Sequence, residues 1–145
     1  MTRPYMPGYG ISRSSDGLLP WSFAEERLVA AQRYWLSTVS PDGAPHTMPV
    51  WAVWLDQALW FSTGTRSRKA RNLRERPACS VHPDGADVVV LNGTAELGAD
   101  PAAALAAYRD KYAETPPDPL VRVRPTAVFA LVEAEFTTSP TLWRF

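Results

Sequence analysis

The segment from Trp60 to Arg76, WFSTGTRSRKARNLRER, concentrates positive charge at the predicted start of a helix. Ser67 is the type of residue that caps helix N-termini. Four cationic side chains surround it: Arg66, Arg68, Lys69 and Arg71. Helix N-termini carry partial positive charge and favour acidic side chains, so each cation in the first turn costs about 0.3–1 kcal/mol. This cost predicts that an anion binds there and offsets it.

The residues around the cations supply the neutral groups of a phosphate site. Hydroxyl groups come from four side chains: Ser62, Thr63, Thr65 and Ser67. Gly64 allows backbone amides to approach a ligand, and Arg68 and Lys69 lie beside the amides of the helix start. The residue types alone leave a second interpretation equally open, in which the helix is solvated and its charges only keep the surface soluble.

Residues for other chemistry are sparse. His46 and His82 lie far apart, and neither has a metal-ligand spacing. No nucleotide-binding glycine motif or serine hydrolase motif is present. Cys79 is the only cysteine and lies in a strand pattern, which predicts a buried structural thiol, no disulfide and a reducing cytoplasmic location. If the protein is an enzyme, we therefore expect a cofactor to carry the reaction.

The elements that would position these residues are mostly short strands. We expect an irregular N-terminal arm over residues 1–20 and one domain over residues 21–145. A helix is predicted from Phe23, with Ser22 as its cap and Glu25 completing a capping box. The other predicted helices follow Ser67 and Asp100. The predicted strands are 34–40, 46–54, 58–64, 78–82, 88–97 and 126–136, with a loop at 115–119.

The turns between strands contain Asp-Gly pairs, which are typical of antiparallel hairpins. Several short strands with few helices favour a small closed structure. We therefore predict a mainly β, predominantly antiparallel barrel with peripheral helices.

The composition excludes some partners. Lys and Arg total 15 and Asp and Glu total 15, so the net charge gives no reason to expect nucleic acid. No run approaches the ~18 apolar residues of a membrane-spanning helix, so no membrane association is expected.

The segment 45–81, PHTMPVWAVWLDQALWFSTGTRSRKARNLRERPACSV, resembles the core of the pyridoxamine 5'-phosphate oxidase-like superfamily. These proteins are flavin- and deazaflavin-dependent oxidoreductases with a split β-barrel fold. The resemblance runs from about Tyr34 to Gly93 and is weaker at the C-terminal LWRF. The pattern F-x-T-x-x-x-S-R-K-x-x-x-L, from Phe61 to Leu73, is its most specific part.

The resemblance implies the site residues. The cofactor phosphate would be held by Ser67, Arg68 and Lys69, and two residues at the end of the preceding strand would also contact the cofactor, Ser62 and Thr63. The flavin ring would lie along the strand residues Met48, Pro49 and Val50. Pro49 agrees with this, because proline in a strand requires an open edge. In the family the cofactor lies at a dimer interface, so Trp143 and Arg144 near the C-terminus would help to complete the site.

The sequence also departs from true pyridoxamine phosphate oxidases, because HTMPVW replaces a strand that begins with Arg and ends with Lys. The resemblance therefore implies FMN or the deazaflavin F420, with Arg66 and Arg71 available for a longer anionic tail. The leading hypothesis is an oxidoreductase that transfers hydride to or from a small organic substrate. A non-catalytic binder of flavin, haem or another planar anionic cofactor is the alternative, and a single-stranded nucleic-acid binder is disfavoured.

The strand segment MPVWAVW, residues 48–54, is apolar on both faces. One small barrel has a single interior, so part of this surface needs another cover. We therefore predict a homodimer with the cofactor at its interface.

Overall fold

The computed structural model describes residues 1–116 and 119–145, so the predicted loop 115–119 lies partly outside the described residues. Eight strands form one sheet: β1 (Tyr34–Val39), β2 (Pro45–Val50), β3 (Ala52–Leu55), β4 (Ala58–Ser62), β5 (Ala78–Pro83), β6 (Val88–Glu96), β7 (Leu120–Leu131) and β8 (Thr141–Arg144). The helices are α1 (Trp21–Ala30), α2 (Arg68–Glu75), α3 (Ala102–Tyr112) and the short 3₁₀ helix η1 (Glu133–Glu135).

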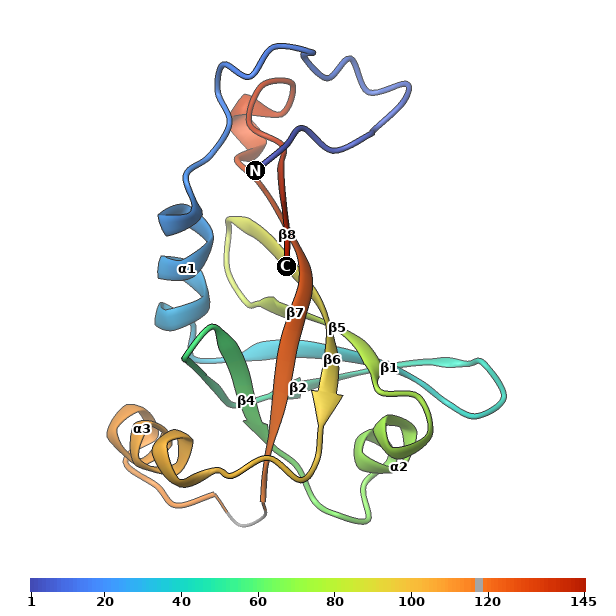
Figure 1. The fold of residues 1–145 in the computed structure, drawn as a ribbon, viewed down its shortest axis with the longest axis vertical. Coiled ribbons are helices and arrows are strands. Elements are labelled where there is room, and N and C mark those ends of the chain that lie inside the picture. The colour runs from blue at the N-terminus through green and yellow to red at the C-terminus, as the bar shows by residue number, and fades with distance from the viewer. Residues whose placement is uncertain (117–118) are drawn as a thin grey trace.

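The sheet has the order β2-β1-β5-β6-β7-β4-β3, with β8 added beside β7, and the paired strands are antiparallel (Figure 1). β2 and β3 lie at opposite ends of this order but are separated in the chain only by Trp51. The sheet therefore curls until its two edges approach, which gives a split β-barrel. The predicted fold class is confirmed.

The hairpins follow from local sequence. Asp56 and Gln57 both have positive φ, 51° and 58°, as a two-residue turn between twisted antiparallel strands requires. Gly93 lies at a β-bulge, where the pairing of β6 with β7 shifts. A Cβ atom at Gly93 would lie 2.4 Å from the Arg124 carbonyl oxygen, so only glycine fits there.

Several predicted boundaries were wrong. Helix α1 begins at Trp21 after Pro20, and Ser22 does not cap it. Glu25 instead accepts hydrogen bonds from Trp54 Nε1 and Gln57 Nε2, both at 2.9 Å, so the capping box is absent.

The strand predicted at 46–54 is two strands, because Trp51 interrupts it and the two parts pair with different neighbours. The last long strand begins at Leu120 and ends at Leu131, before the predicted end at residue 136. Pro125 lies inside β7, opposite Gly93. Proline has no amide hydrogen to donate to a neighbouring strand, and the bulge at this point interrupts the regular hydrogen-bond pattern.

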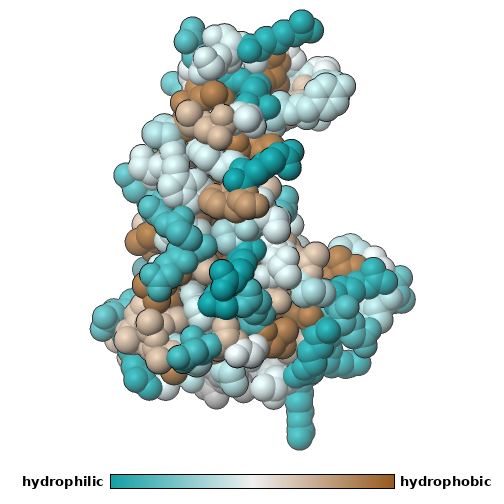
Figure 2. Space-filling view, in the orientation of Figure 1, coloured by the Kyte–Doolittle hydropathy of each residue, from teal (hydrophilic) through white to brown (hydrophobic). Residues whose placement is uncertain are grey.

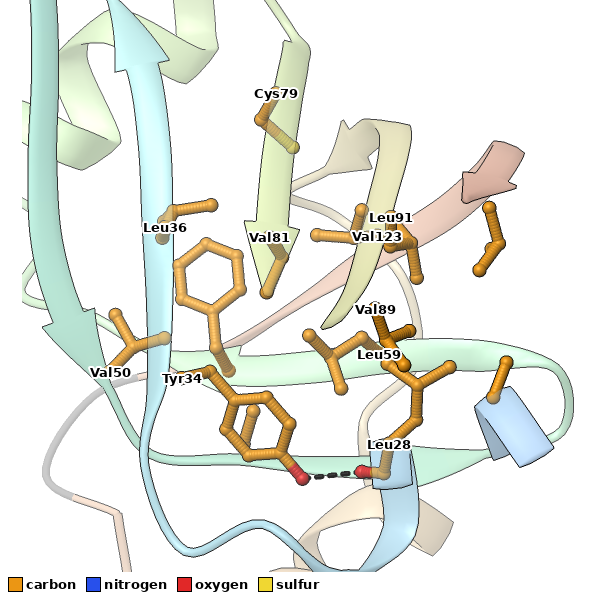
Figure 3. Packing of buried hydrophobic residues seen from close by; sticks show 14 of the residues in the cluster. Leu28, Tyr34, Leu36, Val50, Leu59, Cys79, Val81, Val89, Leu91 and Val123 are labelled. Carbon is orange, nitrogen blue, oxygen red and sulfur yellow. Dashed lines mark hydrogen bonds between the residues drawn. The ribbon is translucent and has the colours of Figure 1, made fainter. Parts of the chain in front are cut away.

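The main core fills the concave side of the sheet (Figure 3). Alternate residues of β1 point inward, and Tyr34 and Leu36 are fully buried against residues of β5, β6 and β7. The Tyr34 hydroxyl donates to the Leu28 carbonyl oxygen of α1. Cys79 is buried in this core, and burial raises the pKa of its thiol to about 12, which confirms the structural interpretation of this residue.

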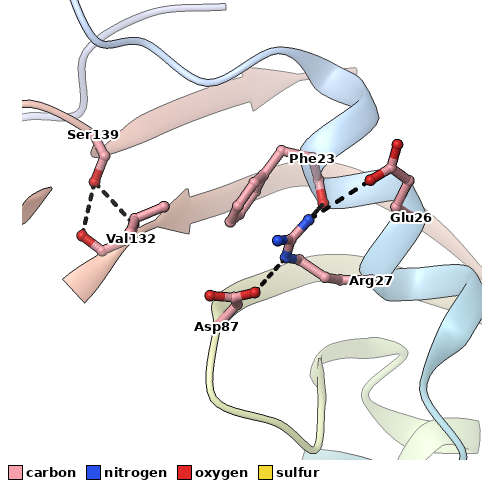
Figure 4. A network of polar contacts seen from close by, with 6 residues as sticks. All are labelled: Phe23, Glu26, Arg27, Asp87, Val132 and Ser139. Atoms are coloured by element: carbon pink, nitrogen blue, oxygen red, sulfur yellow. Dashed lines mark hydrogen bonds and ion pairs between the residues drawn. The ribbon is translucent and has the colours of Figure 1, made fainter. Parts of the chain in front are cut away.

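Helix α1 and the C-terminal segment are fixed by polar contacts (Figure 4). Arg27 Nε donates to Asp87 Oδ2 at 2.7 Å, and its Nη1 donates to the Phe23 carbonyl at 2.9 Å. Ser139 Oγ accepts from the Val132 amide at 2.8 Å and donates to the Val132 carbonyl at 3.1 Å, closing the turn that contains η1.

The N-terminal residues pack beside this turn rather than on the barrel body (Figure 1). Thr2 forms an isolated bridge with Leu142, and Arg3 donates to the carbonyl oxygens of Thr138 and Pro140. Residues 1–20 contain no named helix or strand. The division into an arm and a domain at residue 20 remains a prediction.

Candidate functional site

The start of α2 has the hydroxyl arrangement expected of an anion site. Ser67 Oγ accepts a hydrogen bond from the Ala70 amide at 3.2 Å, which confirms Ser67 as the helix cap. Thr63 Oγ1 lies 2.8 Å from Ser67 Oγ and is largely buried just after β4. Two hydroxyls therefore lie in contact beside the helix start. Ser62 ends β4 and pairs with Leu120 of β7.

The cations at this helix start lack internal partners. Within residues 1–116 and 119–145, six of the 15 Lys and Arg side chains form neither a hydrogen bond nor an ion pair: Arg13, Arg66, Arg68, Lys69, Arg71 and Arg144. Four of the six are within residues 66–71. Figure 2 shows hydrophilic side chains gathered over α2 at the lower right of the molecule. Charge that is concentrated and unpaired in this way favours an external anion.

A cavity of about 360 Å³ opens beside these cations, between the β1–β2 turn and α2. We call it the turn pocket. Its lining residues are Ser40, Pro41, Asp42, Ala44, Pro45, His46, Arg68, Arg71, Asn72 and Glu75. The turn pocket thus brings β2 and the first turn of α2 to one site.

The β2 residues implied for the flavin ring lie on an edge strand. Pro49 pairs with Trp35 of β1, and among the described residues β2 is the end strand of the sheet, which agrees with the open edge expected of a strand proline. Val50 is buried, whereas the Met48 side chain is 41% exposed. His46 and Met48 are two residues apart in β2, so their side chains lie on the same face of the strand. Met48 is therefore the next residue on that face after His46, which lines the turn pocket.

Trp143 is not close to this site within one chain. Its side chain is 7% exposed, belongs to the main core and packs edge-on against Trp21 at 5.4 Å. Figure 1 places β8 near the upper half of the molecule and α2 at its lower right. Trp143 and Arg144 would therefore reach the cations of α2 only from a second chain, and their role in the site remains a prediction.

Two residues of the turn pocket were missed in the sequence. Asn72 is 2% exposed, and its Nδ2 donates to Thr38 Oγ1 at 3.0 Å, which fixes α2 to β1. His46 was not among the predicted site residues, but it lines the turn pocket, and its Nδ1 is buried and has no partner among the described residues. The sequence signal that could have identified His46 is its spacing of two residues from Met48, which places both side chains on the same face of the strand. No group of three or more His, Cys, Asp or Glu within the described chain could hold a metal ion.

The fold and this site together define a class of β-barrel protein in which a cation-rich helix start lies beside an edge strand of the sheet. The family model for pyridoxamine 5'-phosphate oxidase matches residues 23–135, and the chain belongs to this family.

Three solved structures show the range of similar proteins. An F420 reductase is 29% identical, with a TM-score of 0.58 over 72% of this chain and 94% of that one. A conserved hypothetical protein from Mycobacterium tuberculosis is 21% identical, with a TM-score of 0.69 over 92% and 89%. The haem storage protein HutZ from Vibrio cholerae is 16% identical, with a TM-score of 0.62 over 73% and 90%. The last two show a common fold only, and no curated protein matches the chain.

Proposed function

We propose that the protein binds FMN or the deazaflavin F420 and is an oxidoreductase that transfers hydride to or from a small organic substrate. The observation that carries this proposal is the set of four unpaired cations around the Ser67 cap, in a chain of the pyridoxamine 5'-phosphate oxidase family. The 29% identity to an F420 reductase supports the deazaflavin alternative.

The residues at the start of α2 fit a phosphate group. Arg68 and Lys69 provide charge that nothing else in the described chain neutralises, and Ser67 and Thr63 provide hydroxyls in contact with each other. Charge-assisted hydrogen bonds to phosphate are worth about 1.5–3 kcal/mol each. In this proposal Ser67, Arg68 and Lys69 hold the phosphate, and Ser62 and Thr63 contact the adjoining part of the cofactor.

The ring of the cofactor would lie along Met48, Pro49 and Val50. No paired acid and base was identified in the sequence. The hydride-transfer chemistry would therefore come from the bound cofactor. The chain itself orients the ring: Pro49 leaves the strand edge open, and Val50 is anchored in the core. Holding donor and acceptor in contact is the main contribution such a site makes to rate.

We also propose a homodimer, in which the C-terminal residues Trp143 and Arg144 of one chain lie near the site of the other. No helix in the described residues is long and apolar enough to cross a membrane. We propose a cytoplasmic location, with which the lone buried thiol is compatible.

The test replaces both phosphate cations. Arg68→Gln with Lys69→Gln should weaken the affinity for FMN or F420 at least tenfold, measured by fluorescence titration of the protein without cofactor. The matched control, Arg13→Gln with Arg109→Gln, removes the same charge from exposed positions on the arm and on α3. Equal affinities of the two double variants would contradict the phosphate assignment.

A second measurement separates an enzyme from a carrier. The cofactor-loaded protein is mixed with a reductant and a quinone- or enone-like acceptor, and turnover is followed by absorbance. Multiple turnovers are expected. Tight cofactor binding with no turnover of any acceptor would favour the non-catalytic alternative. The haem storage protein shares only the fold, and no residue contact singles out haem.

A further inference from the structure

The last two residues of α3 hold the corner at which the chain passes from β2 to β3. Trp51 is the single residue between these strands, and Ala52 begins β3. Tyr112 Oη accepts a hydrogen bond from the Ala52 amide at 3.0 Å and lies 2.9 Å from the Ala52 carbonyl oxygen. The Tyr112 ring also stacks on the Trp51 ring, with 4.6 Å between the centroids. Tyr112 therefore fixes both the backbone of the corner and the Trp51 side chain.

Lys111 holds the same corner through its ammonium group. Its Nζ donates to the Ala52 carbonyl oxygen at 2.9 Å, to Tyr34 Oη at 2.8 Å and to the Val29 carbonyl oxygen at 3.3 Å. An ammonium group has three donors, so it can serve these acceptors on β3, β1 and α1 at the same time. A neutral amine has only two N–H groups. Loss of the proton would therefore release at least one of the three elements.

These contacts reach the strand on which we place the cofactor ring. Tyr34 is the partner of Val50 in the pairing of β1 with β2, and Val50 is the last of the three ring residues. Ala52 follows Val50 by two residues in the chain. Lys111 thus fixes the end of β2 through its neighbour in the sheet and through the residue that begins the next strand. The backbone position of Met48, Pro49 and Val50 depends on this end of the strand.

The surroundings of Nζ contain no charge that could replace these contacts. The rings of Tyr34 and Tyr112 face it, with centroids 4.8 and 5.2 Å away, and α1 and β3 present backbone carbonyl groups. Lys111 forms no ion pair within the described residues. Burial lowers the pKa of its ammonium group to about 8, whereas burial raises the pKa of both tyrosines. Lys111 is therefore the group at this corner that loses its proton first as the pH rises.

We propose that Lys111 is a positioning residue for the cofactor ring: its protonated side chain locks the β2–β3 corner and thereby aligns Met48, Pro49 and Val50 along the ring. This inference rests on the proposed function, because it assumes that the ring lies along β2. Cofactor binding then favours the protonated lysine and raises its pKa above the value in the free protein. The affinity for the cofactor is highest below pH 8 and falls as the pH rises through 8.

The test follows cofactor affinity against pH. FMN and F420 are each titrated into the protein without cofactor, by fluorescence, from pH 7 to pH 9.5. The affinity of the wild type should fall at least fivefold over this range. The phosphate does not cause this fall, because a phosphate monoester with a second pKa of about 6 is already charged at pH 7.

Lys111→Met keeps an unbranched side chain but removes the ammonium group. This variant should bind at least fivefold more weakly than the wild type at pH 7, and its affinity should change less than twofold up to pH 9.5. The two proteins should then lie within threefold of each other at pH 9.5. A role of Lys111 in packing alone predicts a constant difference at every pH.

Two controls separate the corner from other charges. Arg109→Met removes a positive charge from an exposed position two residues earlier on α3, and it should change neither the affinity nor its pH profile more than twofold. Arg68→Gln with Lys69→Gln should weaken binding at every pH but retain the fivefold fall. If the fall disappeared in this double variant, it would reflect attraction between Lys111 and the phosphate, and the positioning role would be wrong.

The remaining outcomes distinguish the two proposals. A wild-type affinity that does not change with pH refutes the positioning role whether or not Lys111→Met folds, and the proposed function stands. A pH-independent difference between the wild type and Lys111→Met, or no difference, has the same consequence. If neither cofactor binds the wild type at pH 7, the proposed function fails, and the positioning role fails with it.

Discussion

Trp143 is held by aromatic contacts at the inner face of β8. Its ring packs edge-on against Trp21, which also contacts Phe145 at 5.3 Å, so one residue of α1 anchors the end of the chain. Val128 of β7 lies opposite Trp143 in the sheet. The side chain therefore has a packing role whether or not it also reaches a cofactor.

We expect Trp143→Ala to lower the free energy of unfolding by about 3–5 kcal/mol, because truncating a buried tryptophan leaves a cavity. Urea denaturation measures this, and a loss below 1 kcal/mol would contradict the buried position. Trp143→Phe retains part of the packing, so the variant should stay folded. Its cofactor affinity then reports whether the Trp143 ring contacts the cofactor. If Trp143 forms a wall beside the ring in the dimer, the folded Trp143→Phe variant binds cofactor at least threefold more weakly.

The C-terminal turn of α3 connects three other elements through one side chain. Lys111 Nζ donates to Tyr34 Oη at 2.8 Å, to the Ala52 carbonyl at 2.9 Å and to the Val29 carbonyl at 3.3 Å. These acceptors belong to β1, β3 and α1. The ammonium group therefore ties α3 to the point where the split barrel turns from β2 into β3.

This tether predicts a pH dependence of stability. Burial lowers the pKa of Lys111 from 10.5 to about 8, so between these values the unfolded chain binds more protons than the folded chain. The cost of burying the charge is fully present below pH 8 and is relieved as the pH rises toward 10.5. Relative to Lys111→Met, the wild type should gain stability between pH 8 and pH 10.

Urea unfolding of both proteins at pH 7.5, 8.5 and 9.5 tests this expectation. Above pH 10 the tyrosines oppose the trend, because burial raises the pKa of Tyr34 and raises that of Tyr112 to about 12, so both keep their protons in the folded state. Parallel stability curves for the wild type and Lys111→Met between pH 7.5 and 9.5 would contradict the prediction.

Elements governed by neighbouring residues were predictable from the sequence. The Ser67 cap, the bulge at Gly93 and the open edge at Pro49 each follow from the backbone preferences of one residue type. The break at Trp51 was missed, because apolar residues continue through it and only strand pairing separates β2 from β3. The contacts of Lys111 were missed for the same reason, since its three acceptors are distant in sequence.

The same distinction applies to the candidate site. The segment 62–69, which we propose to bind the cofactor phosphate, is contiguous, so its residues could be identified together in the sequence. The turn pocket combines the β1–β2 turn with α2, two segments separated by β3 and β4. No local pattern relates His46 to Arg71, and their common site depends on the curl of the whole sheet.

At the scale of the whole molecule, one face of the β1–β2 pair points away from the main core. In β1, Tyr34 and Leu36 point into the core, so Trp35 and Val39 point to the opposite face. Pro49 and Pro45 pair with them on β2, and the hydrogen-bonded hydroxyls of Ser37 and Thr47 lie between these two apolar pairs. Next to it, the Trp51 side chain is 43% exposed and stacks on Tyr112 at 4.6 Å.

Exposed apolar surface beside a ligand site is typical of a subunit interface. The predicted homodimer would cover this face and bring the C-terminal strand of one chain toward the cations of the other. The wild type should therefore sediment at about twice the 16.0 kDa mass of one chain at micromolar concentration, with cofactor bound.

Trp51→Asp should weaken this dimer at least tenfold, because aromatic side chains at the centre of an interface contribute about 2 kcal/mol or more. Val29→Asp is the matched control, since Val29 is also an exposed apolar residue but lies on α1, away from β2. Analytical ultracentrifugation of both variants gives the dissociation constants. A monomeric wild type with cofactor bound would rule out the dimer, and equal weakening by both substitutions would place the interface elsewhere. If both chains complete each site, Trp51→Asp should lose both the dimer and the cofactor affinity. Val29→Asp should retain both.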